Sequence, residues 1–130
     1  MEIPTILAFD FGLTRIGAAA SFGTLAEPLR VIANNDKTWT EINKLIEEYH
    51  PNRLLVGVSE REMAELSQEF GQQLAEHFSL PIDYYDETLS SAEVHRKLHE
   101  RDQQKKKYKG PIDHYAASLI LQNYLDENYV

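Results

Sequence analysis

Cysteine is absent from this chain of 130 residues. Disulfide bonds and thiolate zinc sites are therefore excluded, whereas metal sites built from histidine or carboxylate ligands are not. Long hydrophobic runs are absent too, and no window approaches the apolar length that spans a bilayer. The amino-terminal stretch MEIPTILAF lacks the basic flank and the cleavage site of a signal peptide. We therefore expect a soluble cytoplasmic protein with no membrane partner.

Cationic residues are scarce relative to acids. Lysine and arginine number 13 against 21 aspartates and glutamates, which gives a formal net charge of −8 at pH 7. Binding to a polyanion depends on neutralising its phosphates with cationic side chains, so a nucleic-acid-binding function requires a local basic patch. Apolar residues make up 42% of the chain, and this length and composition predict a single domain over residues 1–130.

Apolar runs and turn residues predict an α/β order in which three strands come first. Gly, Pro and short polar stretches separate the apolar runs from one another. The glycines at 12, 17 and 23 suit tight antiparallel connections between strands. Thr38, Ser59 and Ser90 each begin a Ser/Thr-x-x-Glu capping box, in which the hydroxyl and the glutamate satisfy each other's free amides, so each should begin a helix. The expected strands are 6–9, 16–20, 29–33, 54–58 and 81–85, and the expected helices begin at 38, 59, 90 and 111.

Acidic residues lie at the ends of several predicted elements. Asp10 closes the first strand, Asp86 and Glu87 close the fifth, and Asp113 lies in the first turn of the last helix. The carboxyl ends of neighbouring strands share one edge of an open α/β sheet, so these acids should converge there. Clustered carboxylates repel unless a divalent cation neutralises them, and two such ions about 4 Å apart can promote phosphodiester cleavage. The simpler interpretation, that they are turn residues, loop acids and a helix-dipole partner, stays open.

A basic segment, RDQQKKKYKG, occupies residues 101–110 directly before the last helix. Its cations could hold a phosphate backbone through counterion release, and Arg15 adds one more near the first strand. The alternative is a solvated loop with no ligand. The cations of this segment are Arg101, Lys105, Lys106, Lys107 and Lys109.

Four motifs together resemble the YqgF/RuvX family of the RNase H-like superfamily, over nearly the whole chain. In chain order they read AFDFGLTRIGAA, LLVGV, DETLSSAEV and IDHYAASLIL. The most specific is D-x-G-x-x-x-I-G at Asp10, Gly12, Ile16 and Gly17. The family is described as Holliday junction resolvases and as nucleases that mature pre-16S rRNA. The resemblance implies an α/β, RNase H-like fold: a five-stranded mixed sheet, its first three strands antiparallel, with helices on both faces.

The resemblance also implies a site. Its catalytic acids would be Asp10, Glu87 and Asp113, which with Asp86 as a neighbour would bind Mg²⁺ or Mn²⁺, while Gly12 would let the backbone approach the scissile phosphate. The implied partners are precursor rRNA, DNA junctions and the ribosome, bound by a monomer or homodimer. Hydrolysis would use water and form no covalent enzyme intermediate.

Two other functions stay open. A catalytically weak RNA- or ribosome-associated binding module is favoured by the acidic balance and by Thr88, which stands where the family commonly has arginine. An actin-like phosphotransferase also uses a D-x-G turn to hold nucleotide phosphate, but it needs a second lobe that 130 residues do not supply. Metal-dependent nuclease activity is the leading hypothesis.

Overall fold

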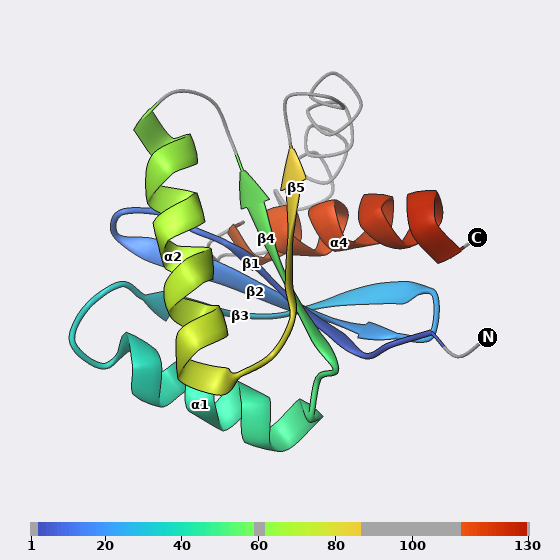
Figure 1. Ribbon diagram of the computed structural model, residues 1–130, viewed down its shortest axis with the longest axis horizontal. Helices are drawn as coiled ribbons and strands as arrows, with labels where there is room; N and C mark the ends of the chain where they lie inside the picture. The colour runs from blue at the N-terminus through green and yellow to red at the C-terminus, as the bar shows by residue number, and fades with distance from the viewer. Residues whose placement is uncertain (1–2, 59–61, 87–112, 130) are drawn as a thin grey trace, which may run out of the picture.

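The computed structural model describes residues 3–58, 62–86 and 113–129 (Figure 1). The predicted capping boxes at 59 and 90 and the basic segment 101–110 lie outside the described residues. No helix in the described ranges is long and apolar enough to cross a membrane. The elements are β1 (Ile6–Asp10), β2 (Arg15–Phe22), β3 (Leu25–Ala33), α1 (Thr38–Tyr49), β4 (Arg53–Val58), α2 (Glu62–Phe78), β5 (Ile82–Asp86) and α4 (Asp113–Tyr129).

The five strands form one mixed sheet in the order β3-β2-β1-β4-β5. β1 pairs antiparallel with β2, and β2 antiparallel with β3, whereas β4 lies parallel to β1 and β5 parallel to β4. The prediction that the first three strands are antiparallel within a mixed sheet is thus confirmed. β3 begins at Leu25, earlier than the predicted residue 29, because its first residues pair with β2 as far as Phe22.

The continuous apolar run of β1 is explained by helices on both faces of the sheet. Leu7 and Phe9 belong to a core with α1 and α2, while Ile6 and Ala8 belong to a second core with α4. Figure 1 shows α1 and α2 together on one side of the sheet and α4 on the other. Successive side chains of a strand point to opposite faces, so the next residue, Asp10, lies on the α4 face.

The start of α1 differs from the predicted capping box. Lys37, not Thr38, occupies the N-cap position, and no side chain caps the helix there. The Thr38 hydroxyl instead donates to the carbonyl oxygen of Ala33 (2.9 Å) and accepts from the backbone amide of Asn35 (2.9 Å). The capping prediction is therefore wrong at this helix, because the hydroxyl closes the β3–α1 connection rather than the first turn.

Candidate active site at the end of β1

Asp10 lies in a row of the sheet that carries few side chains. It is the last residue of β1 and is paired with Gly17 of β2 and Gly57 of β4, and Gly57 is paired in turn with Tyr85 of β5. Paired residues in one row share a face, so backbone alone flanks the Asp10 carboxylate within the sheet. Glycine inside a strand is typical of places where a ligand or another backbone approaches closely. The sequence motif contained Gly17, but the role of Gly57 becomes visible only through the strand register.

The turn after β1 forms a shallow pocket of about 140 Å³ beside Asp10. Its conformation is fixed by Asn34, whose side-chain amide donates to the carbonyl oxygen of Gly12 (2.8 Å) and whose backbone amide donates to that of Thr14 (3.0 Å). A Cβ on Gly12 would lie 2.5 Å from the carbonyl oxygen of Arg15, so the turn itself requires glycine. The pocket is lined by Asp10, Phe11, Gly12, Thr14 and Arg15.

Aromatic packing anchors the carboxyl end of β1 to α2. The ring of Phe70 lies 5.9 Å from that of Phe9 and 4.9 Å from that of Phe11, measured between centroids. Trp39 of α1 packs on the same ring at 5.8 Å. Because Phe9 and Phe11 flank Asp10 in the chain, this cluster fixes the backbone from which the carboxylate projects.

Strand alternation separates Asp86 from Asp10. In β5 the hydroxyl of Tyr84 donates to the carbonyl oxygen of Gln68 in α2 (3.1 Å), whereas Tyr85 belongs to the core with α4. Asp86 follows Tyr85 and therefore returns to the α2 face, opposite to the face that carries Asp10. The spacing of the sequence grouped these two acids at one edge but could not assign their faces.

The other predicted site residues lie at the limits of the described structure. Asp113 is the first residue of α4, the helix that packs on the Asp10 face, but its side chain is not among those described. Glu87 and the cations of residues 101–109 lie outside the described residues. Within the described ranges, no group of three His, Asp or Glu side chains could hold a metal ion. The described part of the site is thus a single carboxylate, a hard oxygen donor of the kind that Mg²⁺ and Mn²⁺ prefer.

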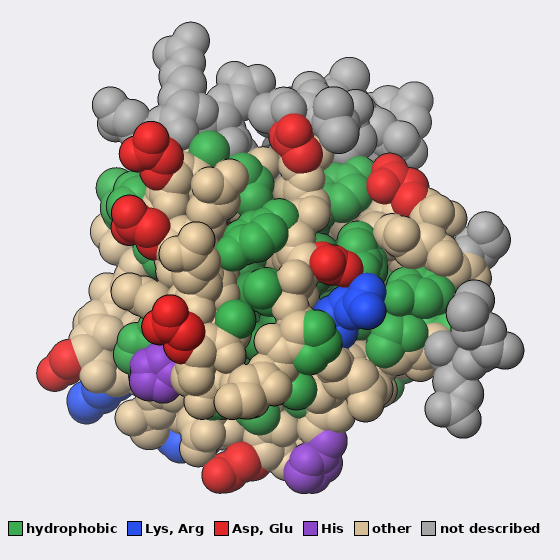
Figure 2. All heavy atoms as spheres, viewed as in Figure 1, with side chains coloured by type: hydrophobic (Ala, Val, Ile, Leu, Met, Phe, Trp, Pro, Cys, Tyr) green, Lys and Arg blue, Asp and Glu red, His purple; other side chains and the backbone are tan. Residues whose placement is uncertain are grey.

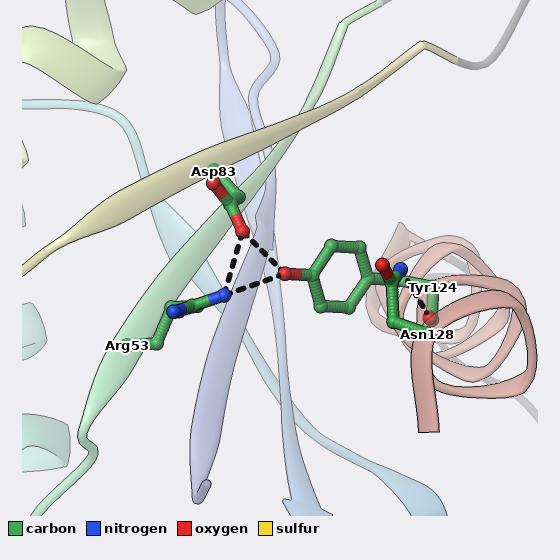
Figure 3. A network of polar contacts seen from close by, with 4 residues as sticks. All are labelled: Arg53, Asp83, Tyr124 and Asn128. Carbon is green, nitrogen blue, oxygen red and sulfur yellow. Dashed lines mark hydrogen bonds and ion pairs between the residues drawn. The ribbon is translucent and has the colours of Figure 1, made fainter. Parts of the chain in front are cut away.

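A polar network fastens the second half of α4 to the sheet (Figure 3). The Arg53 guanidinium donates to the Asp83 carboxylate (3.0 Å) and to the hydroxyl of Tyr124 (3.1 Å), and that hydroxyl donates to Asp83 as well. Burial and the hydrogen bond to Asp83 raise the pKa of Tyr124 to about 12. The Asn128 side-chain amide donates to the Tyr124 carbonyl oxygen (2.8 Å). This network holds α4 against β4 and β5.

The opposite edge of the sheet holds α4 through one glutamine. The side-chain amide of Gln122 donates to the carbonyl oxygen of Thr24 (2.8 Å), and its side-chain oxygen accepts from the backbone amide of Ala26 (2.9 Å). Both partners belong to the β2–β3 hairpin. The helix that begins at Asp113 is therefore tied to both halves of the sheet on the face that carries Asp10.

Comparison with known families gives this arrangement a context. A family model described as RuvX, Holliday junction resolvase, matches residues 4–127. The chain belongs to the RuvX family. A protein of Dechloromonas aromatica named "Putative pre-16S rRNA nuclease" is 38% identical over 132 residues, covering 94% of this chain and 90% of the relative. The same name is given to an Aeromonas salmonicida protein that is 34% identical and covers 99% of both chains.

Solved structures confirm the fold of this RuvX family member. Thermus thermophilus RuvC in complex with a Holliday junction substrate aligns with a TM-score of 0.60 and 12% identity, covering 95% of this chain and 94% of that one. The Fowlpox virus resolvase, solved with substrate Holliday junction DNA, aligns with a TM-score of 0.61 and 12% identity, covering 97% and 99%. At such low identity the likeness establishes the RNase H-like fold alone, as the sequence motifs predicted.

Proposed function

We propose that this protein is a metal-dependent nuclease that hydrolyses phosphodiester bonds in precursor 16S rRNA during cytoplasmic ribosome biogenesis. DNA junctions would be a second substrate class, and one domain spanning residues 1–130 would carry the activity. The proposal is supported by the names of the relatives at 34–38% identity. Its structural support is the place of Asp10, a carboxylate at a strand end between Gly17 and Gly57.

In this proposal Asp10, Glu87 and Asp113 supply the oxygen ligands of the site. When bound there, Mg²⁺ or Mn²⁺ would activate water and stabilise charge on the phosphate oxygens. The chain's own contribution is positioning: the Phe70 cluster fixes the β1 backbone, and the network of Tyr124 holds α4 on the face of Asp10. Asp86 is not needed in this set, because strand alternation directs it to the other face.

Phosphate binding would use the pocket beside Asp10 and the basic segment. Arg15 and Gly12 both line the pocket, and the missing side chain of Gly12 leaves room for the carbonyl oxygen of Arg15 to close the turn. The cations of the basic segment would neutralise phosphates further along the bound RNA. They are Arg101, Lys105, Lys106, Lys107 and Lys109.

The test is cleavage of a precursor 16S rRNA fragment with Mg²⁺ or Mn²⁺ by wild-type protein and two variants. Asp10→Asn should lower the rate by about 100-fold or more, because it removes a charged ligand whose contribution is worth several kcal/mol. Asp86→Asn is the matched control and should stay within about threefold of wild type, since its carboxylate lies on the other face.

The outcomes separate the hypotheses. Equal cleavage by wild type and Asp10→Asn would reject the assigned site. A stronger loss in Asp86→Asn than in Asp10→Asn would reject the assignment of faces. Tight RNA binding by the wild type without cleavage under any metal condition would favour the binding module over the nuclease.

A further inference from the structure

Cations are distributed unevenly over the described residues. The described residues include five Lys and Arg side chains. One of them, Arg53, is held in the network with Asp83 and Tyr124. The remaining four belong to one continuous part of the chain, from the start of β2 to the second turn of α1. They are Arg15, Arg30, Lys37 and Lys44.

Three of these cations, Arg30, Lys37 and Lys44, surround the start of α1 and are called here the α1 corner. Glu41 forms ion pairs with both Arg30 (3.3 Å) and Lys44 (3.1 Å), so one acid is shared by two cations. Asp36 is the second acid of this stretch, which leaves three cations against two acids in a chain whose net charge is −8. In the view of Figure 2, red side chains are spread over the described surface, whereas blue ones are visible only at the lower left and right of the centre.

The α1 corner contains a hollow of its own, of about 260 Å³. Arg30 and Lys37 both line it, together with the polar side chain of Asn35. A hollow that places two cations and an amide at its wall offers hydrogen bonds and charge to a phosphate group. Its lining residues are Arg30, Val31, Ile32, Ala33, Asn35, Lys37 and Glu41.

This hollow is connected to the Asp10 pocket by the end of the β2–β3 ladder. Arg15, which lines the Asp10 pocket, pairs with Ala33, which lines the hollow. The next residue, Asn34, bonds back to the turn after β1. The backbone at residues 34–35, called here the rim, therefore runs from the wall of the hollow to the turn beside the Asp10 pocket.

The cations that line the two pockets, Arg15 and Arg30, come from opposite faces of the sheet. Arg30 pairs with Ala18, a member of the core with α1 and α2, whereas Arg15 alternates to the face of Asp10. A polyanion that reaches both pockets must cross the end of the sheet rather than follow one face. An extended single strand of RNA has the flexibility for such a path, and a regular duplex does not.

We propose that the α1 corner is a second phosphate-binding site, which holds the backbone of a single-stranded polynucleotide after it has crossed the rim at residues 34–35 from the Asp10 pocket. This inference rests on the proposed function for the identity of the polyanion. Contacts to phosphate carry no sequence information, so the site contributes affinity and direction rather than base specificity. It fixes on which side of Asp10 the substrate leaves the protein.

The test uses a fluorescently labelled single-stranded RNA of about 20 nucleotides, bound by the full chain carrying Asp10→Asn so that no cleavage interferes. Affinity is measured by anisotropy over a series of NaCl concentrations. Adding Lys37→Gln should weaken binding and lower the slope of log K against log salt by about 0.7, the value for one lost phosphate contact on a single strand. Lys37→Arg keeps the charge and should keep the slope.

A compensated variant excludes an effect of net charge alone. Glu76→Gln on α2, added to Lys37→Gln, restores the net charge at a position outside the corner. Binding should stay weak in this double variant, and recovery to the affinity of the Asp10→Asn parent would overturn the inference. Equal melting temperatures of Lys37→Gln and Lys37→Arg confirm that both are folded.

The result does not depend on the nuclease assay. An unchanged salt slope in Lys37→Gln, with normal cleavage by the wild type, overturns the α1 corner and leaves the proposed function intact. A lowered slope in Lys37→Gln, together with no RNA cleavage by the wild type under any metal condition, supports the α1 corner and rejects the nuclease.

Discussion

At the scale of single residues, glycine determines what surrounds the candidate catalytic carboxylate. Gly17 and Gly57 flank Asp10 within the sheet, and Gly12 allows the turn after β1 to close on the carbonyl oxygen of Arg15. Sequence motifs located Asp10 and two of these glycines. The motif LLVGV also contains Gly57, but it could not show that Gly57 lies beside Asp10, because this depends on a parallel pairing between strands more than 40 residues apart.

Gly12→Ala tests this closure. The new methyl group would meet backbone at 2.5 Å, so the turn must shift, and we expect a loss of about 1–3 kcal/mol in the free energy of unfolding together with weakened cleavage. Urea unfolding and the precursor rRNA assay measure the two effects.

Gly23→Ala is the matched control for that variant. Gly23 has a φ of +62°, and no atom lies within 4 Å of an added Cβ. Its substitution should therefore lower the free energy of unfolding only by the strain of an alanine in the left-handed conformation, about 1–2 kcal/mol. Cleavage should be unchanged, since Gly23 lies in the β2–β3 turn away from Asp10. A Gly12→Ala protein with the stability and activity of wild type would contradict the required close approach.

At the scale of elements, α4 shows where pattern reasoning succeeds and where it stops. The sequence pattern predicted a final helix, and α4 is described from Asp113 to Tyr129, with Tyr124 only 6% exposed. The spacing could not show that its hydroxyl bonds Arg53 and Asp83, residues 71 and 41 positions away. Thr38 is similar, since a hydroxyl that matched a capping motif bonds the preceding loop instead. The hydrogen-bond partners of such polar side chains depend on tertiary contacts, which local sequence patterns do not predict.

Tyr124→Phe should change how the free energy of unfolding depends on pH in the alkaline range. The pKa of Tyr124 is raised from 10.0 to about 12. Between these two pH values the folded protein therefore keeps the hydroxyl proton, whereas the unfolded chain loses it. The resulting stabilisation is fully present below pH 10 and is lost as pH rises through 12; it amounts to about 2 kcal/mol. Urea unfolding at pH 8 and at pH 12 should show wild type losing this amount in excess of Tyr124→Phe. Parallel losses in both proteins would contradict the assignment.

At the scale of the whole molecule, the order of elements followed from the sequence more readily than their arrangement. Apolar runs predicted strands at 6–9 and 54–58, and β1 and β4 lie there with their residues divided between the cores on both faces of the sheet. The mixed topology came from the family resemblance, because periodicity states that a segment is a strand but not which strand it pairs with. Residue spacing likewise brought four acids to one edge, and only the register showed that Asp86 belongs to the other face.

Metal binding by the folded protein should raise its melting temperature, and the acidity of the whole chain determines which controls are needed. A ligand at about ten times its Kd stabilises the native state by about 1.4 kcal/mol, which for a domain of this size raises the melting temperature by about 4 °C. Mg²⁺ or Mn²⁺ should produce this rise in wild type and in Asp86→Asn but not in Asp10→Asn, with NaCl at matched ionic strength as reference. A net charge of −8 attracts divalent cations to the surface of every variant. The difference between the variants therefore carries the result: an equal rise in Asp10→Asn would mean that the ions bind the acidic surface and not the end of β1.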